Sequence, residues 1–256
     1  MANHFKDGSE QKSGKWYRVL VFLLLVVFLV SAFLFGRGLW QGYEEQKEFK
    51  NMADNISEMD PDARTAEGYL VQYADLYEKN KDFAGWLCVP DCNVNLPVMS
   101  TPEELEYYLH RDFQKKDSKS GTLFLDGDTE DDCMIIYGHN MKNGTMFGSL
   151  DNYVKPEFFT EHKQFSFDTL TERREYEVFA VVKTEIPKEK TDEFLYFEKP
   201  GKLSEQEDAE LIGWFKDHSM YDTGVMPEKE DQILLLSTCS YHTDLGRLVV
   251  AARRVN

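Results

Sequence analysis

The segment Ile233-Leu-Leu-Leu-Ser-Thr-Cys239-Ser-Tyr-His-Thr-Asp-Leu-Gly-Arg247-Leu-Val-Val250 predicts two strands joined by a polar loop. Cys239 ends the first apolar run, and Arg247 stands just before the second. Short apolar runs bounded by turn residues are typical of buried strands. We therefore expect a β-structure in which a thiol and a guanidinium group lie at the two ends of one loop.

The chain is long enough for one large domain with additional segments, and its charge is strongly acidic. It has 256 residues, of which 42% are hydrophobic, and 46 acidic side chains against 29 basic ones give a net charge of −17. Because such a surface repels phosphate groups, a nucleic-acid partner is not expected. The cysteines at 88, 92, 133 and 239 are too few and too irregularly spaced for a disulfide framework.

The N-terminal region has the pattern of a membrane anchor. Residues 19–35 are apolar, with Ser31 as the only clearly polar member. As a helix they span roughly 26 Å, close to the thickness of a hydrocarbon core. Basic residues precede the segment, so the N-terminus is expected in the cytosol. We predict a cytoplasmic tail over 1–18, a transmembrane anchor over 19–38, and the rest of the chain outside the cell.

A cleaved signal peptide is the alternative to an anchor. Its apolar region is normally shorter and is followed by a small-x-small cleavage site. Here Ala32 is followed by Phe33, Leu34 and Phe35, which fit such a site poorly. The uncleaved anchor is therefore the preferred interpretation.

Two helices are expected after the anchor, as a stalk or N-terminal brace over 39–81. The first covers Trp40–Met59, where Asp60-Pro61 interrupts it. The second covers Thr65–Asn80, because apolar residues recur at i, i+3, i+4 and i+7 from Leu70 and give the helix one apolar face.

Residues 82–256 are expected to form one domain of short strands with few helices. The expected strands are Phe83–Val89, Val94–Met99, Gly121–Asp126, Met134–Tyr137, Glu175–Thr184, Phe194–Phe197 and the two that begin at Ile233 and Arg247. Helix-start patterns lie at Thr101-Pro102-Glu103-Glu104, for a helix running to about Arg111, and at the capping box Ser204-Glu-Gln-Glu207. Because strands and helices do not alternate regularly, we predict a small mixed barrel, mainly β, and not a doubly wound sheet.

Three side chains could carry chemistry. Cys239 ends an apolar run in polar surroundings and is a candidate nucleophile, although a strand-end cysteine can equally be an inert small hydrophobic residue. His139 follows the strand at 134–137 and a glycine, so it also stands at a strand end and is the candidate base. Arg247 either caps the edge of the core or offers a fixed fork of donors to an oxyanion.

The other histidines and a metal site are alternatives to this set. His110, His162 and His218 lie in charged contexts that suit the surface, while His242 is a rim residue or a competing base. Cys239 and His242 have ligand-like spacing, but no CxxC or HxxxH pair completes a zinc site, so no metal or other cofactor is expected.

The remaining cysteines have structural interpretations. Cys88 and Cys92 could pair across the Pro90 turn in an oxidising exterior, but two unpaired thiols are the preferred interpretation. Cys133 lies beside a strand and is expected to be structural.

Several motifs together resemble the class B sortases. They are Tyr137-Gly-His-Asn-Met141, Gly144-Thr-Met-Phe147, and Leu236-Ser-Thr-Cys239 followed by Arg247. The resemblance runs from about Asp82 to the C-terminus, and the helix from Ser204 matches the extra helix that marks class B. It implies an eight-stranded β-barrel with N-terminal helices, and a membrane-tethered cysteine transpeptidase of Gram-positive bacteria.

The resemblance also implies roles and partners. Cys239 would be the nucleophile, His139 the general acid and base, and Arg247 the stabiliser of the oxyanion or substrate. The substrates would be secreted proteins with a C-terminal sorting signal, cleaved after Thr through a thioacyl enzyme and transferred to the amine of a lipid-linked peptidoglycan precursor. Ser237 and Leu96 resemble residues that bind the substrate peptide.

Two other functions remain open from the residues alone. A papain-like or cell-wall cysteine hydrolase would use the same thiol with water as acceptor, although those families usually place Cys before His in the chain. A non-enzymatic, membrane-anchored binding module would carry Cys239 and His139 incidentally.

Overall fold

The computed structural model describes residues 10–189, 193–239, 243 and 245–256. The chain divides into two compact units, Met1–Gln46 and Lys47–Asn256. The first contains most of the long helix α1 (Glu10–Ser57), and the second contains all other elements.

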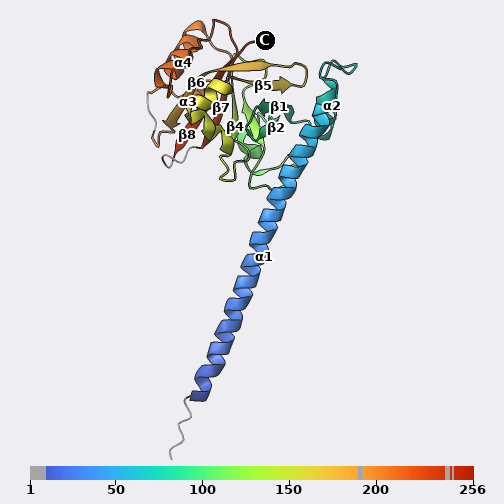
Figure 1. Ribbon diagram of the computed structural model, residues 1–256, viewed down its shortest axis with the longest axis vertical. Coiled ribbons are helices and arrows are strands. Elements are labelled where there is room, and N and C mark those ends of the chain that lie inside the picture. Colours follow the sequence, from blue (N-terminus) through green and yellow to red (C-terminus); the bar gives the residue numbers. More distant parts are fainter. Residues whose placement is uncertain (1–9, 190–192, 240–242, 244) are drawn as a thin grey trace, which may run out of the picture. The chain divides into compact units, whose positions relative to one another are not determined.

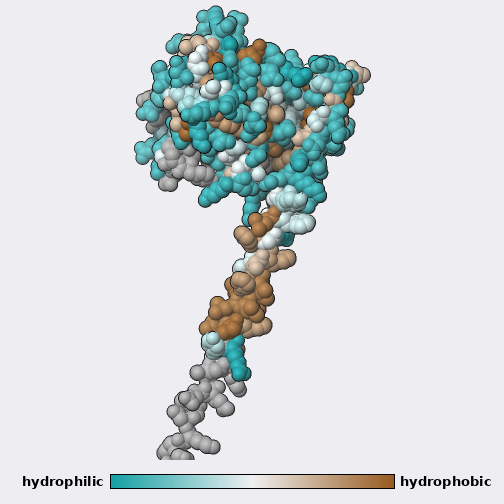
Figure 2. Space-filling view, in the orientation of Figure 1, coloured by the Kyte–Doolittle hydropathy of each residue, from teal (hydrophilic) through white to brown (hydrophobic). Residues whose placement is uncertain are grey.

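Helix α1 includes the apolar N-terminal segment. Its portion Trp16–Ser57 is long and apolar enough to cross a membrane by length and composition. The large hydrophobic side chains of Val19–Phe35 are exposed, and Figure 2 shows them as a brown band along the helix. The expected anchor and the first brace helix are thus one continuous helix that ends at Ser57, three residues before Asp60-Pro61.

The last turns of α1 and helix α2 (Val71–Lys79) belong to the second unit. Phe49, Tyr73 and Leu76 are buried in its main core. The prediction that α2 starts at Thr65 was wrong. Gly68 has φ of +88°, and the Thr65 N–H donates to the Tyr69 carbonyl, so this segment folds as a turn. The division into tail, anchor, brace and catalytic domain remains a prediction.

Eight strands close into a barrel, as the resemblance implied. The strands are β1 (Phe83–Val89), β2 (Val94–Met99), β3 (Leu123–Asp126), β4 (Cys133–Gly138), β5 (Gln164–Thr169), β6 (Glu175–Glu185), β7 (Ile233–Cys239) and β8 (Gly246–Arg254). Their order is β1-β2-β3-β4-β7-β8-β6-β5, and β5 pairs back onto β1 (Figure 1). Only the β2–β3 and β4–β7 pairs are parallel among the pairings described.

The shorter elements differ from prediction in three places. The helix expected from Thr101 is a 3₁₀ helix, η1, that covers only Leu105–His110. The Thr101 hydroxyl donates to the Glu104 carbonyl at 3.0 Å, so it is not the expected N-cap acceptor. The expected strand Phe194–Phe197 contains the start of a 3₁₀ helix, η3 (Tyr196–Glu198). Strand β5 was not predicted, nor were η2 (Gly148–Val154) and α3 (Pro156–Glu161).

Helix α4 (Glu205–His218) confirms the capping box. The Ser204 hydroxyl accepts from the Glu207 N–H, and the Glu207 carboxylate accepts from the Ser204 N–H at 3.0 Å. Figure 1 shows α4, in orange, beside β6. Its buried residues Leu211 and Phe215 pack in a second apolar cluster on the outside of the barrel.

The strands under α4 and η3 are buried on both faces. On β7, Leu234 and Leu236 belong to the main core, while Ile233 and Leu235 belong to the outer cluster with Phe215. Successive side chains of a strand point to opposite faces, so an uninterrupted apolar run is needed where both faces are covered. This explains why the sequence of β7 shows no alternation of polar and apolar residues.

Candidate active site

The register of three adjacent strands brings Cys239, His139 and Arg247 to one edge of the barrel. In the parallel β4–β7 pair, Gly138 is opposite Thr238, so His139 and Cys239 both follow the last paired rung. In the antiparallel β7–β8 pair, Cys239 is opposite Arg247. Neighbouring strands lie about 4.8 Å apart, so the three residues occupy adjacent positions.

Strand alternation also places the side chains of Cys239 and Arg247 on one face. Cys239 shares its face of β7 with Ile233 and Leu235, which pack in the outer cluster. Arg247 shares its face of β8 with Val249 and Ala251 of the same cluster. The side chains therefore project outside the barrel interior, on the side that η3 and α4 cover.

A pocket of about 400 Å³ holds all three residues. It is lined by Leu105, Glu106, Leu109, Phe124, Asp126, Tyr137, Gly138, His139, Ile186, Tyr196, Phe197, Ser237, Thr238, Cys239 and Arg247. The lining is mainly apolar and aromatic, with a few polar groups at the strand ends, as is usual in sites that bind a ligand. Burial raises the pKa of the Asp126 carboxyl at one side of the pocket.

The imidazole of His139 is held by a backbone carbonyl. Its Nε2 lies 2.9 Å from the Leu109 oxygen. Because a carbonyl oxygen only accepts, Nε2 carries a hydrogen and the neutral ring presents its lone pair at Nδ1. His110 stacks on the ring with centroids 5.5 Å apart. Burial, together with the charge of His110, holds the pKa of His139 below its ordinary value, against the opposing effect of the Leu109 carbonyl. Such a ring is neutral near pH 7 and can accept a proton.

Cys239 is half-buried at the last position of β7. Its carbonyl oxygen accepts a hydrogen bond from the Asn140 side chain, with Nδ2 to oxygen at 2.9 Å. This hydrogen bond holds the backbone of Cys239 at the end of β7.

Arg247 and two hydroxyl groups form the other wall of the pocket. Arg247 is half-buried, and its Nη1 donates to the Gly246 carbonyl at 3.0 Å. The Tyr196 hydroxyl and the Ser237 hydroxyl are 2.9 Å apart. Burial raises the pKa of Tyr196, although the Ser237 hydrogen bond and the Arg247 charge act to lower it. Tyr196 therefore stays protonated beside the guanidinium group.

Of the residues predicted to bind a peptide, one lies in the pocket and one does not. Ser237 lines it. Leu96 is on β2, only 6% exposed, and packs in the main core because its side chain points into the barrel. We therefore leave Leu96 out of the candidate site.

Sequence reasoning missed Tyr196 and the Leu109 carbonyl. Tyr196 was assigned to a strand, and nothing in its local pattern indicates that it faces Ser237. A backbone carbonyl carries no sequence signal. Asn140 stands next to His139 within a motif already singled out, so its position was available from the sequence.

The environment of His162 differs from the prediction. The residue was expected at the surface, but it is 9% exposed, with Nε2 2.9 Å from the Asp91 carboxylate and Nδ1 2.8 Å from the Phe158 carbonyl. It buries its ring against Phe158, with centroids 3.9 Å apart. His110 and His218 are exposed, whereas His242 and Asp244 lie outside the described residues.

The four cysteines are free in the structure. Cys133 is buried in β4, and burial raises its pKa to about 12. Burial also raises the pKa of Cys92, to about 11, and that of Cys88. These thiols are poor nucleophiles near neutral pH.

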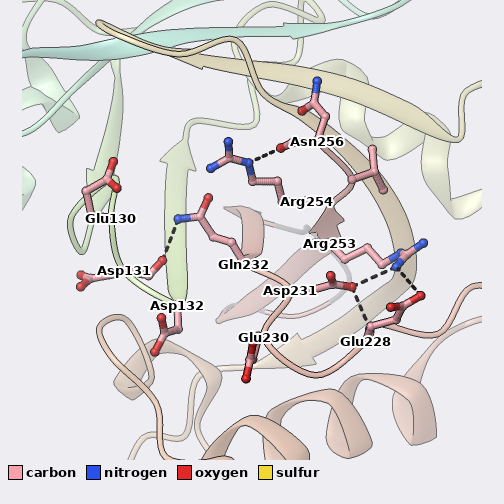
Figure 3. Close-up of a pocket in the computed structure, with 11 residues that line it drawn as sticks. Glu130, Asp131, Asp132, Glu228, Glu230, Asp231, Gln232, Arg253, Arg254 and Asn256 are labelled. Atoms are coloured by element: carbon pink, nitrogen blue, oxygen red, sulfur yellow. Dashed lines mark hydrogen bonds and ion pairs between the residues drawn. The ribbon is translucent and has the colours of Figure 1, made fainter.

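A second hollow, of about 550 Å³, lies at the other ends of the same strands (Figure 3). It is lined mainly by carboxylates, some of them held by Arg253, whose Nη1 is 3.0 Å from Asp231. Gln232 donates to the Asp131 carbonyl at 2.7 Å. Across the described ranges, no group of three or more His, Cys, Asp or Glu is arranged to hold a metal ion.

Comparison with known proteins identifies the family. The Sortase domain family model matches residues 87–255. Sortase B of Listeria monocytogenes is 31% identical over 244 residues, which cover 92% of this chain and 95% of that protein. The chain belongs to the sortase family, class B.

Other class B sortases are also similar to this chain. Sortase B of Staphylococcus aureus is 28% identical over 249 residues, covering 93% of this chain and 97% of that protein. The crystal structure of sortase B from Bacillus anthracis in complex with AAEK1 matches with a TM-score of 0.73 at 29% identity, covering 85% of this chain and 99% of that one. The sortase is thus a cysteine transpeptidase of the cell wall, which confirms the enzyme class expected from the motifs.

Proposed function

We propose that this sortase cleaves a C-terminal sorting signal after Thr and transfers the new carboxyl end to the amine of a lipid-linked peptidoglycan precursor. The observation that carries the proposal is the register of β4, β7 and β8, which gathers Cys239, His139 and Arg247 at one pocket.

In the first step, His139 takes the thiol proton of Cys239 at Nδ1, and the sulfur attacks the Thr carbonyl carbon of the sorting signal. The peptide C–N bond breaks, and His139 gives a proton to the departing amine. A thioester then links the substrate to Cys239. Such a covalent intermediate divides one difficult acyl transfer into two easier steps.

In the second step, the precursor amine attacks the thioester. His139 takes a proton from the amine, the C–S bond breaks, and the thiol of Cys239 is restored. The hydrogen bond from His139 Nε2 to the Leu109 carbonyl supports this role, because it leaves Nδ1 to exchange the proton in both directions.

Arg247 would stabilise the oxyanion that forms on the Thr carbonyl oxygen. It stands opposite Cys239 in the β7–β8 ladder and shares the same pocket, which supports the assignment. A planar guanidinium group offers donors of fixed direction, so it favours the charge of the transition state over the neutral carbonyl.

Ser237 and Tyr196 would contact the sorting peptide beside the scissile bond. Their hydroxyl groups are paired in the pocket wall, two residues from the nucleophile in the case of Ser237. A pair of this kind can donate to, and accept from, a peptide backbone.

The apolar part of α1 would hold the enzyme at the outer face of the cell membrane, with the N-terminus in the cytosol. Its length and composition support a single span. The basic residues before the span favour this orientation.

The test measures the products that the full-length chain forms from a Thr-containing sorting peptide and an amine acceptor. Transpeptidation predicts an amide product that increases with amine concentration and disappears in Cys239→Ala. A hydrolysed peptide that persists at saturating amine would favour a cysteine hydrolase. Binding without any Cys239-dependent product would favour a binding module.

A further inference from the structure

The side chain of Asn140 joins the segment that carries the candidate base to the nucleophile. Asn140 directly follows His139 and is only 6% exposed. Its Nδ2 donates to the Cys239 carbonyl at 2.9 Å and to the Asp151 carboxylate at 3.2 Å. One amide nitrogen therefore contacts both a strand end and a residue of η2.

The loop around Asn140 is tightly folded. The Phe147 N–H donates to the His139 carbonyl at 2.9 Å, and Asn140 forms a bridge with Met146. Met146 has φ of +52°, and a Cβ on Gly148 would lie 2.3 Å from the Met141 carbonyl. Contacts with Met146 and Phe147 therefore hold the backbone of His139 and Asn140 within this loop, independently of the contact with β7.

The contact lies where the parallel β4–β7 ladder stops. The last described rung pairs Gly138 with Thr238, and the Thr238 hydroxyl donates to the Gly138 carbonyl at 2.7 Å. Asn140 extends this connection beyond the ladder to the Cys239 carbonyl. The Asn140 side chain thus contacts β7 one position beyond the last described rung.

We propose that Asn140, oriented by Asp151, is a positioning residue that holds Cys239 in register with His139. The inference rests on the proposed roles of these two residues in the transfer reaction. The amide is required because the Cys239 carbonyl and the Asp151 carboxylate are both acceptors, so the residue between them has to donate. An aspartate at 140 would place a third acceptor there.

The chain offers a matched control in Asn93. It is exposed, and its Nδ2 donates to the Gly144 carbonyl of the same loop at 3.1 Å. Asn93→Asp removes an amide that donates to this loop, and it leaves the hydrogen bond between Asn140 and the Cys239 carbonyl in place. Asp151 is also exposed, so Asp151→Ala tests the second half of the contact without disturbing a packed core.

The first measurement is the alkylation rate of Cys239 by iodoacetamide at pH 7 in the full-length chain in detergent micelles. Mass spectrometry resolves the site, and each variant is compared with the wild-type chain under the same conditions. We expect Asn140→Asp to lower the Cys239 rate by about tenfold relative to wild type, because a thiol displaced from its base is deprotonated less readily. Asp151→Ala gives a smaller loss, and Asn93→Asp gives none.

The second measurement is steady-state transpeptidation. Asn140→Asp lowers kcat by about 10- to 100-fold with little change in KM, the expected effect of misplaced reacting groups. Asp151→Asn, which keeps an oxygen acceptor, restores most of the activity lost in Asp151→Ala.

An unchanged Cys239 alkylation rate in both Asn140→Asp and Asp151→Ala would overturn the inference. So would equal losses in Asn140→Asp and Asn93→Asp that follow the melting temperature, since these indicate a general effect on the loop. If wild-type enzyme transfers no sorting peptide while Asn140→Asp still slows alkylation, the positioning role stands and the proposed function fails.

Discussion

Arg247 shows how one residue can be tested apart from the fold. It is half-buried, its described hydrogen bond goes to the neighbouring carbonyl of Gly246, and it lines the pocket with Cys239. Replacing Arg247 should therefore have little effect on core packing, but it would remove the proposed stabiliser of the oxyanion.

We expect Arg247→Ala to lower kcat by about 100- to 1,000-fold, the usual effect of losing an oxyanion donor. Arg247→Lys should remain well below wild type, because an ammonium group lacks the planar fork. Steady-state kinetics on a sorting peptide give both values. Full activity in Arg247→Lys would show that charge alone suffices.

His110 contributes to the lowered pKa of the candidate base, His139. Burial and the charge of His110 lower the pKa of His139, so the acidic limb of the kcat/KM profile is expected below pH 6.5, the ordinary value for histidine. His110→Gln removes the repulsive charge, and the limb should move to higher pH. A pH–rate profile of both proteins measures the shift, and a shift to lower pH would contradict the assignment.

At the scale of elements, the contact between Asp91 and His162 joins the β1–β2 turn to the end of α3. Burial of His162 lowers its pKa, but the Asp91 carboxylate and the Phe158 carbonyl outweigh it, so the net pKa is raised above the ordinary 6.5. The charged form is thus favoured in the folded protein. The stability it contributes is complete below pH 6.5 and is lost as pH rises through the folded pKa.

Asp91→Asn should reduce this pH dependence, because the Asp91 carboxylate is one of the groups that raise the pKa of His162. Because Asp91 is largely exposed, the expected loss of stability at pH 6 is small, up to about 1 kcal/mol, and it should shrink towards pH 8. Thermal melting of both proteins across this range provides the measurement. A difference between the proteins that grows with pH would contradict the account.

The same elements show what the sequence could predict. The apolar runs of β4, β7 and β8 and the capping box of α4 are local signals, so these elements were expected with nearly the observed bounds. The environment of His162 and the position of Tyr196 depend on contacts between segments distant in the chain. Polar context alone placed His162 at the surface, and only the fold brings Asp91 to it.

The candidate site was also predictable only in part from the sequence. His139, Cys239 and Arg247 each end or begin an apolar run, and that pattern was sufficient to select them. The pairing of β4 with β7, which brings two of them together, joins strands about 100 residues apart and leaves no periodic signal. The Leu109 carbonyl, which sets the tautomer of His139, could not be read from any side chain.

At the scale of the whole molecule, one long apolar helix accompanies the barrel unit. If α1 anchors the enzyme, the full-length chain should sediment with membranes, and a variant with residues 1–38 removed should appear in the soluble fraction. Protease added to intact cells without a wall should digest the barrel unit and spare the N-terminal tail. A protected barrel unit would contradict the proposed orientation.

The central claim is that Cys239 forms a thioester with the sorting signal. Mass spectrometry of the wild-type chain, mixed with a small library of Thr-containing sorting peptides and quenched in acid, tests it directly. We expect an adduct that adds the mass of the peptide acid ending at Thr less one water, located on the fragment that contains Cys239 and absent in Cys239→Ala. An adduct on another residue, or turnover of the peptide by Cys239→Ala, would contradict it.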